Sequence, residues 1–503
     1  MKAIVIGAGA GGLAVSNLLA KAGYEVEVFE KNEQLGGRMG LLKKDGFTFD
    51  TGPSWYLMPE VFEQYFSLLG KKPSDYYQLQ KLTPAYKVFF DYAEPITVQG
   101  NLKSDAKTFE TIEPGAGKRL RAYVSDAKNI YQLSLKYFLY NPFRTLKPMV
   151  RDRALFTNSG RLLGGITKPL HSYVKTKFAT KQLQQIMEYA MVFLGTSPFK
   201  APSLYRLMSY LDFEQGVFFP KGGMIQVTNA LHQAGTELGV TYQTNTPVDS
   251  IVVKDGHAVG VRINGKLVEA DIVISNADLA FTELSLLQPE YQTYPQQYWD
   301  KKKAAPSALL LYIGVSGSLP NLEHHNLLFV DQWQKNFNDI YKDSQWPKNA
   351  SMYFSKTSAT DASTAPKNHE NIFVLVPLPP GKMPSPSKQK KLVDDYLQQL
   401  STAIKVPDFV QRIVSIEVRG PRYFDQAFHS WQHSALGLNH TLMQSAFMRP
   451  NIKSKKVDNL YYVGGMTQPG IGIPMCLISA ELVLKSLAGD TTPGPLNSMP
   501  ELR

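Results

Sequence analysis

The chain has 503 residues, several times the length of a typical single domain, so two or three structural units are expected. Hydrophobic residues make up 43% and charged residues 19%, which argues against a disordered or fibrous protein. The formal net charge of +11 favours an anionic partner, either nucleic acid or phospholipid. The basic residues are scattered, and no zinc-finger spacing or aromatic RNA-binding box occurs, so nucleic acid is not expected as a partner.

Cysteine usage and the amino-terminal stretch bear on the cellular location. Cys476 is the only cysteine, so no intrachain disulfide can form and a cytoplasmic location is expected. The apolar stretch that ends near Ala20 imitates a signal peptide, but glycines interrupt it and a strand pattern follows. The longest apolar runs, such as 308–315, fall short of the ~20 residues of a spanning helix. Any membrane contact is therefore expected to be peripheral.

A glycine-rich turn follows the first predicted strand. Residues 2–6 have the pattern of a short buried strand, and residues 13–20 have that of a helix. The turn between them contains Gly7, Gly9 and Gly12, which is the dinucleotide-binding fingerprint in its proper context. Gly7 permits the tight turn, Gly9 lets the backbone approach a pyrophosphate, and Gly12 allows close packing of helix and strand.

An acidic residue completes this nucleotide-binding unit. Glu30 closes the second predicted strand, at 26–29, and lies 18 residues after Gly12. At that position a carboxylate accepts hydrogen bonds from the adenosine ribose and repels a 2′-phosphate, so NADP is disfavoured.

A second pair of glycines follows at once. Residues 31–38 run from Lys31 through Gly36 and Gly37 to Arg38, and residues 47–53 include Gly52. An acid followed closely by Gly-Gly-Arg resembles the extended fingerprint of the two-glycine flavoproteins, which include amine oxidases, protoporphyrinogen oxidases and carotenoid desaturases. The resemblance implies FAD as the cofactor, with Arg38 as a fixed planar cation directed towards the diphosphate.

Two later segments look like the remaining FAD contacts of this family. The first, 242–253, resembles a strand whose backbone meets the adenine at Val248, and 271–277 then returns the chain to the nucleotide domain. The second, 458–474, looks like the carotenoid-desaturase signature, in which a strand leads through glycines into a helix beginning near Pro474. In this second segment the resemblance implies cofactor contacts at Gly465, Met466, Gly472 and Ile473.

Two further stretches, 219–224 and 444–450, favour the bacterial phytoene and dehydrosqualene desaturases over the amine oxidases. One departure concerns the signature itself. Gln468 stands where these desaturases commonly carry histidine, and Ile471 replaces a smaller residue. A sister group of carotenoid oxygenases and ketolases also lacks that histidine, so it stays open as an alternative.

The fold implied by the resemblance is α/β, with a two-glycine-type FAD-binding Rossmann domain and a discontinuous substrate domain built on a mixed β-sheet. We expect the FAD-binding domain at 1–75, 215–290 and 455–490, the substrate domain at 76–110 and 291–454, and a helical, membrane-associating part at 111–214. Strand patterns at 307–313, 351–354, 372–376 and 413–418 predict a sheet that forms the floor of an apolar channel.

The aromatic and basic run 137–144 is the candidate for membrane attachment, with the alternative that its aromatics fill a helical core. His429 and His433 stand four apart, as metal ligands on a helix do, but no third ligand is apparent and no metal is expected. No G-x-S-x-G nucleophile motif occurs.

The resemblance implies desaturation of a C30 or C40 polyisoprenoid, dehydrosqualene or phytoene, by hydride transfer to flavin during carotenoid biosynthesis. The proton acceptor is either a carboxylate or the reduced flavin, and no catalytic residue is identified. No second nucleotide fingerprint occurs, so an external acceptor, oxygen or a quinone, is expected. More distant alternatives are an amine oxidase and a flavin-free prenyl-lipid carrier of the same fold.

Overall fold

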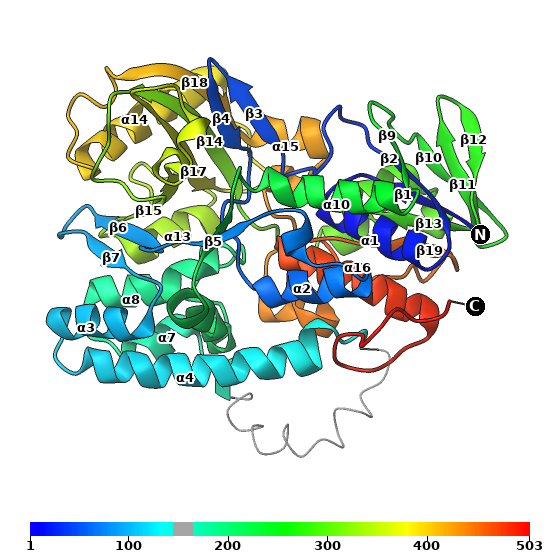
Figure 1. Cartoon of the computed structure of the whole chain (residues 1–503), viewed down its shortest axis with the longest axis horizontal. Coiled ribbons are helices and arrows are strands. Elements are labelled where there is room, and N and C mark those ends of the chain that lie inside the picture. The colour runs from blue at the N-terminus through cyan, green and yellow to red at the C-terminus, as the bar shows by residue number, and fades with distance from the viewer. Residues whose placement is uncertain (144–163, 503) are drawn as a thin grey trace.

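The computed structural model describes residues 1–143 and 164–502. Figure 1 shows three blocks of structure: a parallel sheet with its helices around both chain termini, a mixed sheet beneath α14, and a layer of helices below the mixed sheet. The first and last parts of the chain lie together in the first block.

The first block is built on an all-parallel sheet with strand order β19-β13-β1-β2-β9. Val5 of β1 pairs with Val28 on one side and Ile274 on the other, so β1 is central. Its residues from Ala3 to Ile6 are buried, as expected for a parallel strand covered on both faces. The strands are β1 Lys2–Ile6, β2 Glu25–Phe29, β9 Thr241–Gln243, β13 Ile272–Ser275 and β19 Leu460–Tyr462, which confirms the strands predicted at 2–6 and 26–29.

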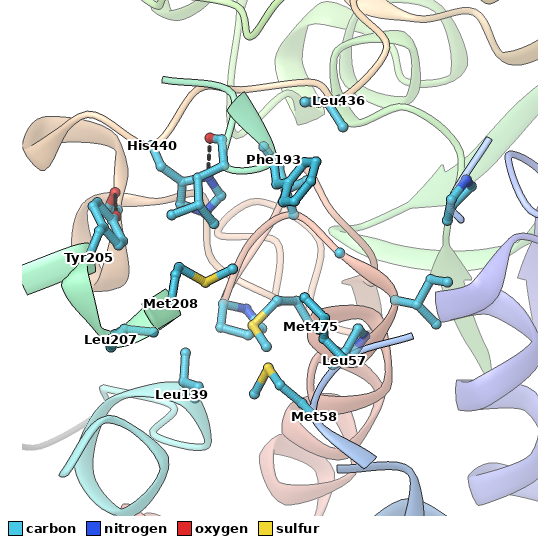
Figure 2. A pocket seen from close by; sticks show the side chains of 18 of the residues that line it. Leu57, Met58, Leu139, Phe193, Tyr205, Leu207, Met208, Leu436, His440 and Met475 are labelled. Carbon is cyan, nitrogen blue, oxygen red and sulfur yellow. Dashed lines mark hydrogen bonds between the residues drawn. The ribbon is translucent and has the colours of Figure 1, made fainter. Parts of the chain in front are cut away.

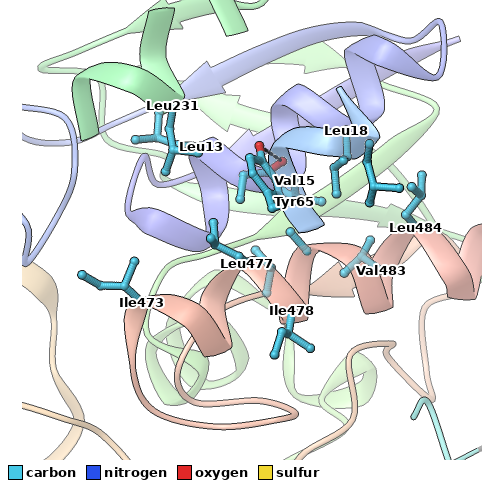
Figure 3. Close-up of a cluster of buried hydrophobic side chains, with 14 of the residues drawn as sticks. Leu13, Val15, Leu18, Tyr65, Leu231, Ile473, Leu477, Ile478, Val483 and Leu484 are labelled. Atoms are coloured by element: carbon cyan, nitrogen blue, oxygen red, sulfur yellow. Dashed lines mark hydrogen bonds between the residues drawn. The ribbon is translucent and has the colours of Figure 1, made fainter. Parts of the chain in front are cut away.

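Three long helices belong to this sheet: α1 Ala10–Lys21, α10 Ile225–Glu237 and α16 Ile473–Ala488. α1 and α16 pack against each other, and Figure 3 shows their leucine, isoleucine and valine side chains meeting in one cluster. Tyr65 of α2 (Pro59–Leu68) reaches into this cluster and donates a hydrogen bond of 3.0 Å to the Ala14 carbonyl. The amino- and carboxy-terminal segments of the chain therefore share one core.

A three-stranded antiparallel sheet, β10 Ser250–Lys254, β11 His257–Ile263 and β12 Lys266–Glu269, stands beside the parallel sheet. The single strand predicted over 242–253 is wrong, because β9 ends at Gln243 and residues 244–249 are not a strand. Asn245 has a positive φ of 52°, and Pro247 lacks the N–H that a ladder needs. The break lets the Thr246 N–H donate to the Glu30 carbonyl at 2.8 Å.

The second block is a seven-stranded mixed sheet with order β18-β14-β17-β16-β15-β6-β7. Helices α13 Trp333–Tyr341 and α14 Pro386–Ala403 pack on it. The strands are β6 Tyr86–Phe90, β7 Ile96–Val98, β14 Ser307–Ser316, β15 His325–Phe329, β16 Met352–Ser355, β17 His369–Leu378 and β18 Ile413–Arg419. The four strands predicted in this part of the chain are confirmed.

The third block is helical, with α3 Leu102–Ile112, α4 Ala116–Ser134, the π-helical turn η2 Leu135–Leu139, α7 Leu170–Lys175 and α8 Lys181–Glu188. The aromatic run predicted as a membrane anchor is largely inward-facing here: Tyr137 and Tyr140 are buried. Arg144, the last residue of that run, lies outside the described residues. Between residues 1 and 143 and between 164 and 502, no helix is both long enough and apolar enough to cross a bilayer.

Shorter elements connect the three blocks. They are β3 Leu41–Lys44, β4 Phe47–Asp50, β5 Leu79–Lys81, β8 Phe218–Pro220, α9 Met208–Tyr210, α11 Leu279–Phe281, α12 Gln296–Trp299, α15 Pro421–Phe428 and the 3-10 turns η11 Leu442–Gln444 and η12 Ala446–Met448.

Candidate functional site

A cleft of about 260 Å³ lies at the carboxyl ends of the parallel strands. Gly7 follows β1, Glu30 follows β2, Asn276 follows β13 and Val463 follows β19, and all four line the cleft. Helix α1 starts from the same edge at Ala10. Ligands of open α/β sheets bind at this edge, where helix N-termini present free N–H groups.

Gly7 and Gly12 have the backbone roles that the sequence predicts for them. Gly7 has φ +89°, a conformation that favours glycine in this tight turn. A Cβ on Gly12 would lie 2.0 Å from the Gly7 carbonyl oxygen, so only glycine lets α1 start this close to β1. Gly12 itself lies behind the cleft, whereas Gly7 and Gly9 line it.

The second glycine pair lies directly on the first loop. Gly9 and Gly36 form a parallel β-bridge, and the Gly36 N–H donates to the Ala8 carbonyl at 2.8 Å. Gly37 lines the cleft beside Gly9. The two glycine motifs, which are separate in the sequence, therefore form one continuous wall of backbone.

Glu30 is buried at the bottom of the cleft. One carboxylate oxygen accepts from the Ala8 N–H at 2.8 Å, and the other accepts from the Asn32 N–H at 2.9 Å and from the Asn32 side-chain amide at 2.8 Å. These bonds fix the orientation of the carboxylate, and the oxygen that accepts from Ala8 retains a lone pair for a further donor.

Lys31 points away from the glycine loops, towards the end of α15. Its ammonium group donates to the Gln426 carbonyl at 2.6 Å and lies 3.2 Å from His429 Nε2. Burial lowers the pKa of Lys31, and Glu30 and Asp425 oppose that shift. Lys31 thus joins the glycine-loop wall to the segment after α15.

His429 and His433, whose spacing of four residues would allow them to share a helix face, do not lie on one helix. His429 ends α15 with its ring stacked on Phe281, at a centroid distance of 4.0 Å, and His433 lies in a following 3-10 turn. Within the two described ranges of the chain, no cluster of three metal-ligating side chains occurs.

Arg38 lies where the cleft opens into a second cavity. One guanidinium nitrogen donates to Ser430 Oγ at 2.6 Å, and the group lies 5.0 Å from the centre of the Phe428 ring. Burial lowers the pKa of Arg38, and the nearby Asp278 carboxylate raises it. In the described part of the chain, the buried Nε of Arg38 has no hydrogen-bond partner, so this cation has capacity left for a ligand.

The carboxy-terminal signature closes the cleft opposite the glycine loops. Gly465 and Met466 follow β19 and line the cleft, and Gly472 precedes the first residue of α16. Pro474 stands in the first turn of α16, as predicted. The amino terminus of α16, with its positive dipole end, therefore faces the ligand space.

Most of the predicted cofactor residues are brought together at this cleft, including Val248 from the segment between β9 and β10. Two are not: Gly12 packs behind it, and Gly52 lines the neighbouring cavity. The predicted residues that line the cleft are Gly7, Gly9, Glu30, Lys31, Gly37, Arg38, Val248, Gly465, Met466, Gly472 and Ile473.

The sequence motifs miss several residues of the cleft. The Asn276 amide donates to the Val463 carbonyl at 3.0 Å and so ties β13 to the end of β19. Asp278 is buried beside Arg38, and burial raises its pKa. Phe428 is the last residue of α15, and Leu436 lies in the irregular stretch that follows. For Asn276 the signal was its place after a predicted strand, but the last two lie in no periodic pattern.

A second, larger cavity of about 810 Å³ adjoins the cleft. Leu310 of β14, Tyr353 of β16 and Leu375 of β17 contribute to it, so the predicted sheet floor is confirmed. Figure 2 shows aliphatic and methionine side chains from several helices converging on its centre. These include Leu57, Met58, Leu139, Leu207, Met208 and Met475.

Few polar groups face this large cavity. His440 Nδ1 lies 3.0 Å from the Leu194 carbonyl, which can only accept, so Nδ1 carries the proton. Burial lowers the pKa of His440 to about 3, and the imidazole is therefore neutral. Gln468 is buried in the wall, and neither its amide nitrogen nor its oxygen has a hydrogen-bond partner among the described residues.

The cleft and the large cavity share a wall. The residues that line both are Arg38, Pro53, Phe428, Ala435, Leu436, Ile471, Gly472 and Ile473. A ligand lying along the cleft would therefore present its end directly to the contents of the large cavity.

Comparisons with known proteins agree with this geometry. The profile of the family described as flavin containing amine oxidoreductase matches residues 10–483. The chain is 41% identical to carotenoid 3,4-desaturase of Haloarcula japonica over 97% of this chain and 98% of that protein. It is 33% identical to zeta-carotene-forming phytoene desaturase of Myxococcus xanthus, covering 96% and 93%. The chain belongs to the flavin-containing amine oxidoreductases, among the carotenoid desaturases.

A third relative, 4,4'-diapophytoene desaturase (4,4'-diaponeurosporene-forming) of Staphylococcus aureus, is 31% identical, covering 98% of this chain and 100% of that protein. Among solved structures, an oxidoreductase from Methanosarcina mazei has a TM-score of 0.64 at 17% identity, covering 96% of this chain and 100% of that one. The chain is thus an FAD-dependent oxidoreductase with the mixed α/β fold of the amine oxidases.

The residues of the cleft fit FAD. The glycine loops leave no side chain between the backbone and a pyrophosphate. They are also too tightly packed for larger residues, since a Cβ on Gly9 would lie 2.7 Å from Asn276 Oδ1 and one on Gly37 would lie 3.2 Å from Gly9 Cα. The unpaired Nε of Arg38 and the start of α16 supply positive character where the cleft meets the large cavity. These hydrogen-bond donors suit an anionic dinucleotide that has an aromatic end.

Proposed function

We propose that the chain catalyses FAD-dependent desaturation of a C30 or C40 carotenoid precursor, dehydrosqualene or phytoene, in carotenoid biosynthesis. One observation carries the proposal: an apolar cavity of about 810 Å³ meets the dinucleotide cleft at a shared wall. Cavities of this size, at the upper end of the ~300–1,000 Å³ range of ligand pockets, suit a long apolar ligand.

We further propose roles for the residues of the cleft. Glu30 accepts hydrogen bonds from the adenosine ribose, and Val248 meets the adenine through its backbone. Arg38 contacts the diphosphate or the adjoining end of the cofactor, because its guanidinium lies at the shared wall. The remaining contacts are expected from backbone at Gly7, Gly9, Lys31, Gly37, Gly52, Gly465, Met466, Gly472 and Ile473, with Gly12 supporting the loop from behind.

The reaction requires the protein to align the substrate with the cofactor and to exclude water from the site. Bound FAD supplies the acceptor for a hydride. The apolar side chains of the large cavity hold one C–H bond of the polyene near the shared wall and exclude water that would attack a delocalised cation. Neutral His440 adds no charge to compete with that cation. Electrons then leave to an external acceptor, oxygen or a quinone.

The two main sheets suggest how the chain divides into domains. We propose an FAD-binding domain at 1–75, 215–290 and 455–490, and a substrate-binding domain at 76–110 and 291–454. The parallel sheet draws all of its strands from the first set and the mixed sheet draws all of its strands from the second, which supports this assignment. Residues 111–214 add helices beside the cavity.

We also propose that the protein works at a membrane surface, peripherally and from the cytoplasmic side. A polyene of this length dissolves in lipid rather than in water, so the enzyme must take its substrate from a bilayer. The net charge of +11 supports attraction to anionic phospholipid.

A carotenoid oxygenase or ketolase acting on terminal methyl groups is the second candidate, and Gln468 favours it. The unpaired amide of Gln468 in the wall of an apolar cavity is where an oxygen substituent would find a hydrogen-bond partner. Desaturation adds conjugated double bonds without oxygen, whereas an oxygenase yields aldehydes or acids, so product analysis separates the two.

A flavin-free prenyl-lipid carrier is the candidate of another class. Rab GDI from Plasmodium falciparum shares the fold at a TM-score of 0.52 and 13% identity. The intact glycine walls and the free capacity of Arg38 support a flavoprotein instead. The visible spectrum of the purified protein distinguishes them, because a carrier shows no flavin bands.

The decisive experiment is incubation of the FAD-loaded chain with phytoene or dehydrosqualene in liposomes, followed by absorption spectroscopy and mass spectrometry. We expect a shift of absorption to longer wavelength and a loss of hydrogen without a gain of oxygen. Oxygenated products would reject desaturation, and turnover of soluble amines alone would indicate an amine oxidase.

A further inference from the structure

Exposed apolar side chains gather at one place on the surface. In the described part of the chain nine large hydrophobic side chains are exposed, and four of these lie within seven consecutive residues. They are Leu442, Met443, Phe447 and Met448, with exposed fractions of 48%, 62%, 65% and 38%. Scattered exposed apolar residues are ordinary, but a contiguous group marks an interaction surface.

This group, residues 442–448, is named here the apolar rim. All four side chains line the large cavity as well as being exposed, so the rim stands where that cavity reaches the surface. Phe143 faces the rim from the end of the helical block, with its ring centre 6.0 Å from that of Phe447. The opening is therefore apolar on both sides.

The rim is held firmly by buried polar bonds beneath it. Arg449 is buried and donates to the carbonyls of Gln444, Leu438, Thr467 and Gly465. Ser445 and Tyr205 share a hydrogen bond of 2.8 Å between their hydroxyl oxygens. Because these bonds fix the backbone, the rim presents its apolar side chains outward instead of collapsing over the cavity.

Basic residues lie next to the rim. The Gln444 side chain exchanges hydrogen bonds of 2.9 Å with the backbone N–H and carbonyl of Lys303. This contact brings the cluster Lys301–Lys303 beside the rim, and Lys301 and Lys303 are exposed. Apolar side chains flanked by lysines suit the boundary between acyl chains and anionic headgroups.

We propose that the apolar rim inserts into an anionic phospholipid bilayer and is the port through which a lipid-dissolved polyene enters the large cavity. The inference rests on the proposed function for the identity of the polyene. It places the membrane contact at residues 442–448 rather than in the helical part 111–214, whose aromatic residues Tyr137 and Tyr140 are buried.

The test is flotation of the FAD-loaded full chain with vesicles of phosphatidylcholine and of phosphatidylcholine with phosphatidylglycerol. In the double variant Met443→Glu, Phe447→Glu we expect at least a tenfold loss of binding to both vesicles. Val414→Glu is the matched control, since Val414 is 55% exposed on β18 but lines neither cavity. Flavin absorbance and thermal unfolding of each variant establish that it is folded.

A charge variant distinguishes the contribution of the lysines to vesicle binding from that of the apolar rim. Lys301→Glu, Lys303→Glu should lower binding to the anionic vesicles and leave binding to the neutral ones within twofold. Binding of the rim variant that equals that of the Val414 control would overturn the inference. A rim variant that turns a dimer into a monomer, with unchanged vesicle binding, would instead make the rim a contact between two copies and would equally overturn it.

The proposed function is tested separately, by conversion of phytoene or dehydrosqualene by the unaltered chain in detergent micelles, where no bilayer is needed. Absence of conversion of both substrates contradicts the proposed desaturation. Flotation tests the membrane contact of the apolar rim whether or not the substrate is converted, because it measures lipid binding without turnover.

Discussion

The cleft and the large cavity are neighbours built on opposite principles. The cleft is made of backbone from glycine loops and strand ends, and a few fixed charges such as Glu30 and Arg38 lie in it. The large cavity is made of aliphatic, aromatic and methionine side chains from all three blocks of the fold. Binding in the cleft depends on exact placement of donors and acceptors, whereas binding in the cavity depends on buried area and shape.

This difference predicts how each region tolerates change. Single substitutions in the cleft should act steeply on FAD and leave the polyene site intact. Single substitutions around the cavity should act modestly, because many side chains share the contact. Two predictions concern the cleft, one concerns the packing behind the cavity and one concerns the shared wall.

Gly12→Val should have the largest effect. Its Cβ would meet the Gly7 carbonyl at 2.0 Å, so strand β1 and helix α1 must separate and the loop can no longer hold a pyrophosphate. We expect a protein without FAD bands and with a lower unfolding temperature. Gly164→Ala is the control, since a Cβ there meets no atom of the described residues within 4 Å. FAD retained by the Gly12 variant would break the assignment of the loop.

Glu30→Gln should weaken FAD binding by about 10–100-fold, the loss expected for charge-assisted hydrogen bonds worth ~1.5–3 kcal/mol. The amide also replaces an acceptor of the Ala8 N–H with a group that can donate. Titration of apoprotein with FAD, followed by flavin fluorescence, measures the change. Exposed Glu33→Gln is the matched control, and equal affinities for the two variants would contradict the ribose role.

Asp212→Asn probes the packing behind the cavity. Tyr86 and Tyr189 donate to the Asp212 carboxyl at 2.7 and 3.0 Å, and burial raises its pKa from 3.8 to about 7. A carboxyl with a raised folded-state pKa contributes stability that is present below about pH 4 and is lost as the pH rises through about 7.

The neutral asparagine should therefore flatten that dependence. We expect the difference in Tm between pH 5 and pH 8 to shrink by ~3 °C or more relative to the unaltered chain. Exposed Asp343→Asn should leave the difference unchanged. An equal fall in Tm for both chains across this range would show that Asp212 does not titrate there.

Ile471→Ala should have the smallest effect. Ile471 lies in the shared wall, and its truncation removes contact area on the cavity side at a cost of ~2 kcal/mol in stability, the low end for such a truncation because the side chain already borders open space. We expect FAD affinity to remain within about threefold, while the KM for the polyene or the spread of products changes by more. Steady-state kinetics with product analysis measures both. A loss of FAD larger than that of Glu30→Gln would overturn the contrast between the regions.

Much of the cleft could be predicted from the sequence because its chemistry is local. Gly7, Gly9 and Gly12 follow one strand at fixed spacing, and Glu30 ends the next, so the parallel arrangement brings them together. The strand predicted through Val248 failed where Pro247 and the left-handed Asn245 interrupt the ladder. A strand pattern does not reveal that Thr246 bonds the Glu30 carbonyl instead.

The large cavity was predictable only in outline. The mixed-sheet floor followed from apolar strand patterns such as that of β14, but β15 was missed because His325 and Asn326 break the alternation. The aromatics of 137–143 look like a surface anchor in sequence, yet Tyr137 is buried. The exposed rim at 442–448 has no periodicity, so only the fold shows which of two apolar segments faces outward.

The wall common to both spaces, with Arg38, Phe428 and Ile471 facing each side, places the cofactor and the polyene against the same side chains. Linkage is reciprocal. If bound FAD changes the affinity for the polyene by some factor, bound polyene therefore changes the affinity for FAD by the same factor. If that factor exceeds one, the enzyme holds its cofactor more tightly when polyene is bound than when the cavity is empty.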